Sequence, residues 1–133
     1  MLNELAKQIH NNAKNKGFYE SEKNIGEILC LIHSELSKAL EADRKGRYSD
    51  ISYFLERQNQ IKSSYNDGTL AIKQEDFVFL FKHCIKDTFE DELADVVIRI
   101  LDLCAFKGID LENHIKAKIR YNSSREHKHG KAY

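Results

Sequence analysis

Proline is absent from this sequence of 133 residues, and glycine occurs only six times. Both residues interrupt regular secondary structure, so a fold of many short strands joined by tight turns is not expected. Alanine, leucine, isoleucine, glutamate and lysine dominate instead, and most of them are good helix formers. The composition predicts an all-α protein, and we expect a bundle of four to five helices.

A net charge of either sign is also lacking, because 21 lysines and arginines balance 21 aspartates and glutamates. A general attraction to a nucleic-acid duplex or to an anionic membrane is therefore not expected, and any anion must bind locally. No apolar run approaches the roughly 18 to 20 residues that cross a bilayer, and the N-terminal stretch lacks the hydrophobic block of a secretory signal. We expect a cytoplasmic protein with neither a membrane nor a duplex as partner.

Cysteine is scarce, and the three that occur, Cys30, Cys84 and Cys104, have no CxxC spacing. An odd number of cysteines without this spacing does not indicate a disulfide framework or a zinc site. Cys30 and Cys104 lie among leucines and isoleucines. We therefore interpret the cysteines as reduced thiols in the core rather than as metal ligands or redox groups.

Apolar residues recur at helical spacing along most of the chain. Four segments with this pattern are expected to be helices: Leu2 to Asn15, about Asn24 to Lys45, a helix closed by Gly108, and Leu111 to Tyr121. Gly17, Gly46 and Gly108 follow the first three, in the position where glycine commonly ends a helix, and Asp110 is a suitable N-cap for the last.

The region at about residues 48–88 is harder to assign. It combines a short amphipathic piece, Ile51 to Ile61, with the turn signal Asn66-Asp67-Gly68. From Lys73 onward the pattern permits either one long helix or two helices with a break near Asp87-Thr88. We treat this region as an excursion within a single domain that covers residues 1–133.

The stretch FEDELADVVIRILDLCAFKG carries acidic residues in an otherwise apolar helix. At about 100° per residue, Glu92, Asp95 and Asp102 form one narrow stripe, and Arg99 lies beside them. The other faces are apolar, so the stripe faces either a thin strip of solvent or an internal cavity. In the first case Arg99 pairs with Asp95 and Asp102 at helical neighbour spacing.

The position of Glu35 supports the interpretation that the stripe faces an internal cavity, because the helical wheel places Glu35 inside the apolar arc of the preceding long helix. A buried carboxylate requires a cation, a metal or hydrogen-bond donors. An acid on one helix that faces two acids three residues apart on another is a common divalent-metal site in bundles. We therefore expect Glu35, Glu92 and Asp95 to bind Mg²⁺, since no histidine or cysteine at matching spacing favours Zn²⁺.

Most of the chain resembles a known family. The resemblance is carried by the stretches NNAKNKGFYES, NIGEILCLIHSELSKALEADRKG and FEDELADVVIRILDLCAFKGIDLENHIKAKIRYNSSREHKHGKAY. They resemble the MazG-like all-α nucleoside triphosphate pyrophosphohydrolases, which are relatives of the dimeric dUTPases. The resemblance implies a MazG-like helical bundle that uses Mg²⁺ to hydrolyse a nucleoside triphosphate to the monophosphate and pyrophosphate; the region from about Tyr48 to Thr88 is not covered.

The resemblance also implies roles for individual residues. The metal site of the family is an ExxE on one helix and an ExxD on a later one, which makes Glu35, Glu92 and Asp95 catalytic metal ligands. The residues implied to contact the nucleotide lie further along the chain: Lys118, Asn122, Arg125, Lys128 and Lys131.

One position departs from the family pattern. Lys38 stands where the family has its second glutamate, so a cation replaces an oxygen ligand and the local charge changes by two units. Glu41 or Asp102 could supply a replacement ligand. We favour a third possibility, in which Lys38 binds phosphate oxygens of the substrate as a point charge.

The leading hypothesis is therefore a Mg²⁺-dependent nucleoside triphosphate pyrophosphohydrolase. The alternative is a catalytically silent nucleotide- or phosphate-binding oligomer, and a purely structural helical oligomer is a third possibility. The consecutive apolar residues 77–81 offer more apolar surface than a small bundle readily covers, although the run also fits an internal core helix. Because members of the family pair their helices across subunits, we expect a homodimer or a tetramer.

Overall fold

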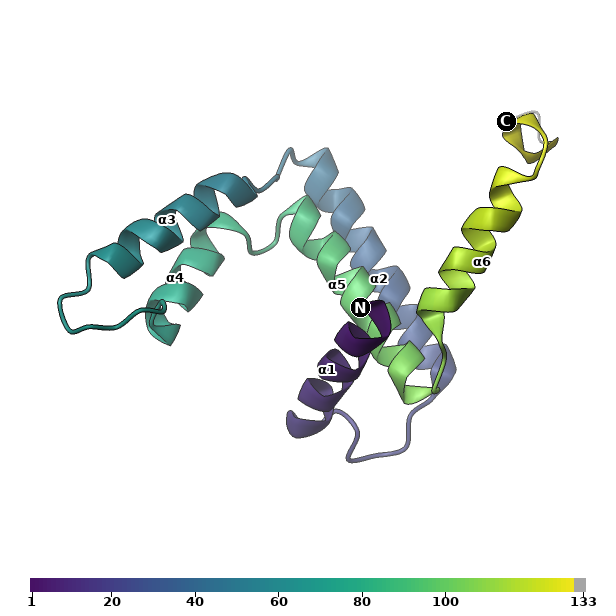
Figure 1. The fold of residues 1–133 in the computed structure, drawn as a ribbon, viewed down its shortest axis with the longest axis horizontal. Coiled ribbons are helices and arrows are strands. Elements are labelled where there is room, and N and C mark those ends of the chain that lie inside the picture. Colours follow the sequence, from purple (N-terminus) through teal and green to yellow (C-terminus); the bar gives the residue numbers. More distant parts are fainter. Residues whose placement is uncertain (131–133) are drawn as a thin grey trace. The chain divides into compact units, whose positions relative to one another are not determined.

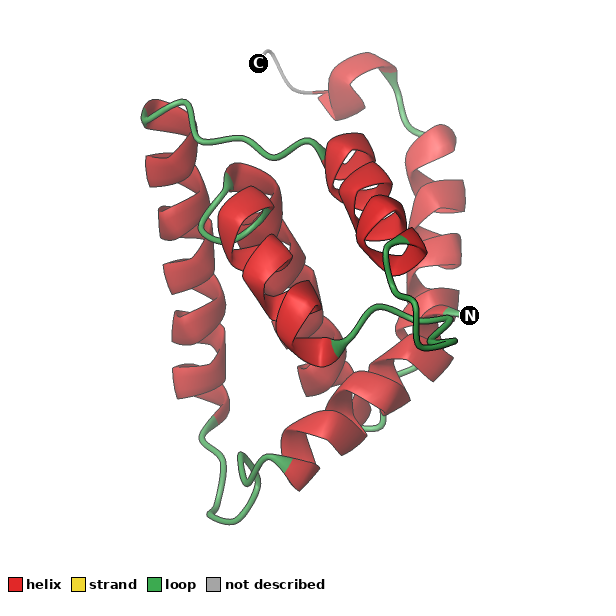
Figure 2. Ribbon diagram, turned by 90° about the vertical axis from the view of Figure 1, so that its left-hand side faces the viewer, coloured by secondary structure: helices red, strands yellow, loops and turns green. Residues whose placement is uncertain are grey.

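The computed structural model of the protein describes residues 1–130, and these residues form helices and loops without any strand (Figure 2). The α-helices are α1 Leu2–Asn15, α2 Ile25–Arg44, α3 Ile51–Ser63, α4 Gln74–Cys84, α5 Phe89–Phe106 and α6 Leu111–Ser123, and a 3-10 helix, η1, follows at His127–Gly130. The all-α prediction is confirmed. Within this described range, no helix has both the length and the apolar character that crossing a membrane requires.

The described residues contain six α-helices rather than the four to five that were predicted. The difference arises in the region at about residues 48–88, where the short amphipathic piece is the helix α3 and a separate helix α4 precedes α5. Of the two possibilities for the chain after Lys73, the pair of helices is correct, because α4 ends at Cys84 and α5 begins at Phe89.

The break between α4 and α5 is fixed by local hydrogen bonds. Asp87 has a φ of 61°, in the left-handed region, so the chain cannot continue α4 through it. The backbone N–H of Asp87 donates to Oδ2 of Asp91 at 2.9 Å, and the N–H of Asp91 donates to Oγ1 of Thr88 at 3.4 Å. The second bond satisfies a donor of the first turn of α5, and the first ties the preceding loop to that turn, so together they set where the helix starts.

The chain divides into two compact units. The central unit consists of residues 29–96, and the terminal unit combines residues 1–28 with the chain from residue 97 onward. The expectation of one domain for the whole chain stays a prediction.

In the central unit, α3 and α4 lie side by side as a helical hairpin (Figure 1). Phe54 of α3 and Leu80 of α4 are buried together with Ile85, and Phe77 and Phe81 pack against them. The rings of Phe54 and Phe77 meet edge to face with centroids 6.0 Å apart, a favourable aromatic geometry. The run of residues 77–81 is therefore partly a core element, while its Val78 and Phe79 remain exposed. 

In the terminal unit, α1 and α6 are in contact. Oε2 of Glu112, in the first turn of α6, accepts a hydrogen bond from the backbone N–H of Leu2 at 3.0 Å. The side-chain amide of Asn3 donates to Oδ1 of Asp110 at 2.7 Å, and Asp110 also accepts from the N–H of Asn113 at 3.1 Å, so it is the N-cap that was predicted. These bonds supply partners for the free donors at the starts of both helices.

The three cysteines are free thiols in different surroundings. Cys104 is buried, as predicted, and Cys84 is partly buried. The prediction is wrong for Cys30, which is exposed on α2 between the half-exposed Leu29 and Leu31. Apolar neighbours in the sequence indicated a core position, but Cys30 and these neighbours are all exposed.

Candidate functional site

Three carboxylates from two helices of the central unit meet at one place. Glu35 comes from the middle of α2, while Glu92 and Asp95 lie three residues apart near the start of α5. One oxygen of each residue can be chosen so that all three lie within 4.8 Å of one another. We call Glu35, Glu92 and Asp95 the carboxylate cluster. The helical spacing on α5 produces the pair, because residues three apart share one helix face.

Burial makes the carboxylate cluster unusual. Glu35 is only 3% exposed and Glu92 is 6% exposed, whereas Asp95 is the most accessible of the three. Glu35 shares the buried face of α2 with Ile32 and Ala39, as the helical wheel indicated. Carboxylates at such positions lose hydration, so they need compensation from a cation or from hydrogen-bond donors.

Lys38 provides part of that compensation. Its Nζ lies 2.8 Å from Oε2 of Glu35, and its side chain is 56% exposed while that of Glu35 is 4% exposed. The hydrogen bond to Glu35 and the charge of Glu35 raise the pKa of Lys38, and the charges of Glu92 and Asp95 act in the same direction. Lys38 is therefore a protonated counter-ion placed at the edge of the cluster.

Glu92 is compensated least. Within the described residues 1–130, its buried Oε2 atom accepts no hydrogen bond. Burial raises the pKa of Glu92, the nearby charge of Lys38 lowers it in part, and the neighbouring Glu35 and Asp95 raise it further. A buried oxygen without a donor, aimed into a group of carboxylates, is where a bound cation would be stabilised.

The donor set fits a hard divalent cation. All three groups are carboxylates, and Mg²⁺ prefers such oxygen ligands while it keeps several waters or phosphate oxygens. Lys38 adds a positive charge beside the three carboxylates, so the site carries less negative charge than three carboxylates alone would give it.

The two alternative ligands considered for the Lys38 position are engaged elsewhere. Glu41 forms an ion pair with Lys45, Oε1 to Nζ at 3.0 Å, and that pairing lowers the pKa of Glu41. Asp102 belongs to the terminal unit, where its Oδ2 accepts a hydrogen bond from the hydroxyl of Tyr19 at 2.7 Å and its Oδ1 lies 2.7 Å from Nδ1 of His10. Neither residue is part of the carboxylate cluster.

The cluster of His10, Tyr19, Asp102 and Phe106 was not predicted from the sequence. The ring of Tyr19 meets that of His10 edge to face at 4.5 Å and lies 5.1 Å from that of Phe106. Burial and the hydrogen bond to Asp102 raise the pKa of the Tyr19 hydroxyl well above its usual range. The position of Asp102 on an apolar helix was the one available signal, and its partners lie 92 and 83 residues away in the chain.

The residues implied to contact a nucleotide lie in the terminal unit. Lys118 and Asn122 are on α6, and Arg125 and Lys128 follow it. Nζ of Lys118 lies 5.1 Å from the ring centre of Tyr121, and the guanidinium carbon of Arg125 lies 5.6 Å from it, so both cations face one ring. Lys131 lies outside the described residues, and the nucleotide-binding role of all five stays a prediction.

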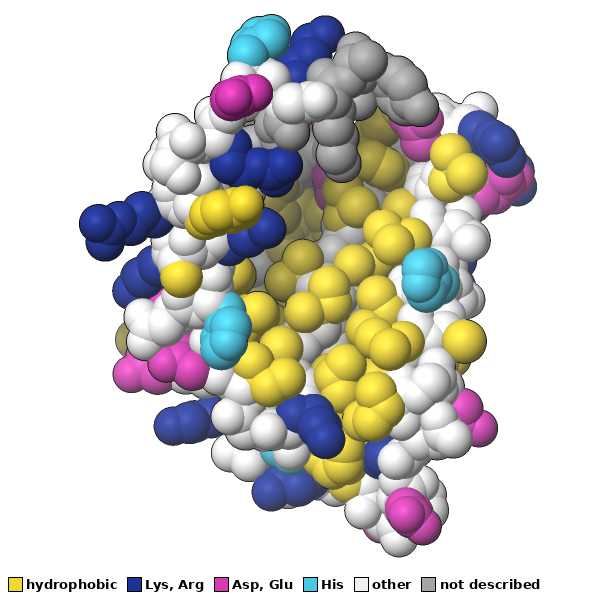
Figure 3. Space-filling model, turned by 90° about the vertical axis from the view of Figure 1, so that its right-hand side faces the viewer, with side chains coloured by type: hydrophobic (Ala, Val, Ile, Leu, Met, Phe, Trp, Pro, Cys, Tyr) yellow, Lys and Arg dark blue, Asp and Glu magenta, His cyan; other side chains and the backbone are white. Residues whose placement is uncertain are grey.

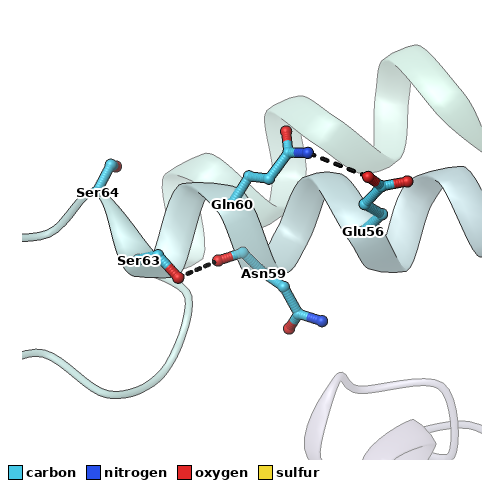
Figure 4. A pocket seen from close by; sticks show the side chains of 5 residues that line it. All are labelled: Glu56, Asn59, Gln60, Ser63 and Ser64. Carbon is cyan, nitrogen blue, oxygen red and sulfur yellow. Dashed lines mark hydrogen bonds between the residues drawn. The ribbon is translucent and has the colours of Figure 1, made fainter.

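A shallow surface depression on α3 is a different kind of feature (Figure 4). It is lined by Glu56, Asn59, Gln60, Ser63 and Ser64. The amide of Gln60 donates to Glu56 at 3.3 Å, and the hydroxyl of Ser63 donates to the carbonyl of Asn59 at 2.9 Å. These bonds stay within one helix, and the single carboxylate offers no counterpart to the carboxylate cluster.

Comparison with known proteins adds no relative. The chain matches no protein-family model, no curated protein and no solved structure. The functional argument therefore depends on the geometry of the carboxylate cluster and on the sequence motifs that resemble the MazG-like family.

Proposed function

We propose that this protein is a Mg²⁺-dependent nucleoside triphosphate pyrophosphohydrolase with a MazG-like helical fold. The observation that supports the proposal is the convergence of Glu35, Glu92 and Asp95, which carry their oxygens to within 4.8 Å of one another from two helices. These are the three acids that the resemblance makes catalytic metal ligands. Chance placement of acids on helix surfaces does not explain why two of them are buried.

In this proposal, Glu35, Glu92 and Asp95 hold the magnesium ion. When bound, that ion supplies positive charge for the phosphate oxygens and lowers the pKa of a water molecule for attack on the triphosphate. Two helices fix the carboxylates, so their arrangement needs little rearrangement during the reaction. The exposed end of Lys38 offers an ammonium to a phosphate oxygen, and the products are the nucleoside monophosphate and pyrophosphate.

The remaining contacts to substrate are proposed from the resemblance. They comprise five polar or basic residues, of which the first two are on α6 and the others follow it in the sequence: Lys118, Asn122, Arg125, Lys128 and Lys131. The triphosphate carries several negative charges, so basic side chains with mobile ends suit its outer phosphates.

A silent nucleotide- or phosphate-binding protein is the second candidate. The observation in its favour is the ion pair between Lys38 and Glu35, because an ammonium already occupies a position beside a proposed metal ligand. In this case the cluster would hold Lys38 for phosphate binding, and no hydrolysis would follow.

We also propose that the protein forms a homodimer or a tetramer. Many hydrophobic side chains are exposed at the surface (Figure 3). On α2, Leu29, Leu36 and Leu40 are between 45% and 50% exposed, and their spacing of seven and four residues places them on one stripe. Patches of this kind mark surfaces that associate.

The enzymatic proposal is tested by incubating the protein with a panel of ribo- and deoxyribonucleoside triphosphates, with and without Mg²⁺. We expect monophosphate and pyrophosphate in equal amounts, formed only with the metal. Glu92→Gln should lower the rate at least 100-fold, because it removes a metal ligand. Glu41→Gln, which alters an exposed acid of α2, is the matched control and should retain the activity.

The outcomes separate the two candidates. Metal-dependent formation of both products that Glu92→Gln abolishes supports the hydrolase. Binding of nucleotide by calorimetry without turnover supports the silent binder, and a protein that neither binds nor hydrolyses nucleotides contradicts both.

A further inference from the structure

The ammonium of Lys38 is in contact with the carboxylate cluster, 2.8 Å from Oε2 of Glu35. We propose that Lys38 is an exchangeable internal counter-ion: a divalent cation displaces it from Glu35, and the released ammonium binds a phosphate oxygen of the substrate. This inference rests on the proposed function and adds to it a coupling, in which metal and phosphate each strengthen the binding of the other.

A divalent cation and the ammonium of Lys38 would compete for the same oxygen of Glu35. Lys38 contacts Oε2 of Glu35 at 2.8 Å, and Glu35 is almost fully buried, so that oxygen cannot turn outward to find another partner. A divalent ion bound by Glu35 would lie close to the ammonium, and the two cations repel each other strongly at such a distance. The cation and the ammonium therefore compete for the same carboxylate.

A second observation shows that Lys38 does not complete the site. Glu92 is 6% exposed, and within residues 1–130 its Oε2 accepts no hydrogen bond. Lys38 forms an ion pair with Glu35 at the edge of the cluster, and the buried Oε2 of Glu92 is left without a donor among the described residues. A divalent ion that contacts both glutamates would satisfy what a single ammonium leaves unsatisfied.

The two partners differ in freedom of movement. The side chain of Lys38 is 56% exposed on the flexible four-carbon stem of a lysine, whereas the side chain of Glu35 is 4% exposed. Lys38 can therefore leave Glu35 by rotating about its side-chain bonds, with α2 unchanged. The position of Lys38 three residues after Glu35 on the same helix keeps the released ammonium near the metal-bound phosphates.

The consequence is a reciprocal coupling. In the absence of phosphate, metal binding must break the Lys38–Glu35 ion pair without a new partner for the ammonium. A phosphate group provides that partner, so phosphate raises the affinity for metal, and the metal raises the affinity for phosphate by the same factor. The lysine thus disfavours metal binding without substrate and favours it with substrate.

The test measures Mn²⁺ binding in phosphate-free buffer by electron paramagnetic resonance, in the full chain and its variants. Lys38→Met keeps the length of the side chain but removes the charge, and we expect it to bind Mn²⁺ about tenfold more tightly than the unaltered protein. Lys45→Met removes the lysine that follows α2 and is ion-paired to Glu41, and the affinity of this variant should not change. Glu92→Gln should abolish binding, which identifies the site.

A second titration measures the phosphate side of the exchange. The probe is methylenediphosphonate, a non-hydrolysable pyrophosphate analogue, added to protein saturated with Mn²⁺. We expect Lys38→Met to bind this probe about tenfold more weakly than the unaltered protein, because the ammonium that contacts phosphate is missing. The opposite signs of the two effects distinguish exchange from a lysine that only maintains the fold.

Each result has a defined meaning. If Lys38→Met and the unaltered protein bind Mn²⁺ equally, at a site that Glu92→Gln abolishes, the exchange is overturned while the metal site stands. Unchanged binding of methylenediphosphonate would overturn the phosphate half. Lys38→Glu adds a fourth carboxylate and should bind Mn²⁺ most tightly, so a complete lack of saturable Mn²⁺ binding in this variant and in Lys38→Met would contradict the proposed function itself.

Discussion

At the scale of single residues, Glu92 is the carboxylate of the cluster whose charge is most costly to bury. Glu35 has the ammonium of Lys38 at 2.8 Å and Asp95 is more accessible to water, but Glu92 is both buried and without a hydrogen-bond donor at Oε2 within the described chain. Burial is the largest cause of its raised pKa. The folded protein therefore binds the proton of Glu92 more strongly than the unfolded chain does.

This difference predicts how stability depends on pH in the absence of metal. The contribution of Glu92 to the free energy of unfolding is fully present below the unfolded-state pKa of 4.5. It is lost as the pH rises through the raised folded-state pKa. Glu92→Gln should remove this loss and stabilise the metal-free protein at pH 7 by about 1 kcal/mol, a few degrees in Tm. Thermal unfolding of both proteins between pH 4 and pH 8 in the presence of a chelator measures it.

Glu41→Gln provides the contrast for this prediction. Pairing with Lys45 lowers the pKa of Glu41, so its replacement should lower the stability at pH 7 rather than raise it. A Glu92→Gln variant that melts at or below the Tm of the unaltered protein at pH 7 would contradict the account of the buried charge.

At the scale of helices, the terminal unit is held together by contacts that the sequence did not reveal. Tyr19, in the loop after α1, donates its hydroxyl hydrogen to Asp102 of α5 at 2.7 Å, and its ring contacts those of His10 and Phe106. Phe18 beside it is 64% exposed, so only one of the two aromatic residues in this loop takes part. Tyr19 therefore links the loop to α5.

Tyr19→Phe should destabilise the protein by about 1 kcal/mol, because it removes this hydrogen bond and leaves an oxygen of Asp102 without its donor. The raised pKa of Tyr19 also predicts how this effect depends on pH. The contribution of the Tyr19 hydroxyl to the free energy of unfolding is present below pH 10 and is lost as the pH rises above that unfolded-state pKa. Urea unfolding at pH 8 and pH 10.5 should show the two proteins converging at the higher pH.

Tyr53→Phe is the matched control, because Tyr53 is 52% exposed on α3 and belongs to the other unit. We expect a change of no more than about 0.5 kcal/mol. Equal effects of the two substitutions would show that the Tyr19 hydroxyl does not stabilise the fold.

The elements that could be predicted from the sequence are those defined by local spacing. The bounds of α1 agree with the prediction, and the burial of Glu35 followed from its place on the helical wheel. The helices α3 and α4 were not both predicted, because their stability depends on contacts such as that of Phe54 with Phe77, which connect distant parts of the chain. 

The candidate site shows the same division. Its three acids were predicted from helix periodicity and from the family resemblance, and the structure brings them together. The ion pair between Lys38 and Glu35 was not predicted, although the two residues are only three apart, because the family pattern has a metal ligand at position 38 and the lysine there was assigned to phosphate. The partners of Asp102 could not be predicted, since no sequence rule connects residues that far apart.

At the scale of the whole molecule, the exposed leucines of α2 are the feature that one chain leaves unexplained. Leu29, Leu36 and Leu40 share a stripe that is about half exposed, next to the buried face that carries Glu35. Self-association would bury this stripe. In a two-fold dimer the same stripe of both subunits is buried, so each leucine contributes once from each chain. This surface is the basis for the proposed homodimer or tetramer.

We expect sedimentation velocity to give at least twice the mass of the chain. Leu36→Lys should weaken association by tenfold or more, because burying one leucine contributes roughly 1.5–3 kcal/mol and the substitution places a charge in the contact twice. Ser37→Lys, an exposed position on the same helix but away from the stripe, is the control and should leave the mass unchanged. A monomer at every concentration would contradict the proposal.

The central claim is that Glu35, Glu92 and Asp95 share one divalent cation. It is tested most directly by a crystal structure of the protein with Mn²⁺ and a non-hydrolysable nucleoside triphosphate, in which the anomalous signal locates the metal. The account predicts a peak within about 2.3 Å of an oxygen of each carboxylate, with the Lys38 ammonium moved from Glu35 to a phosphate. Nucleotide bound without any metal peak among these three carboxylates would contradict it.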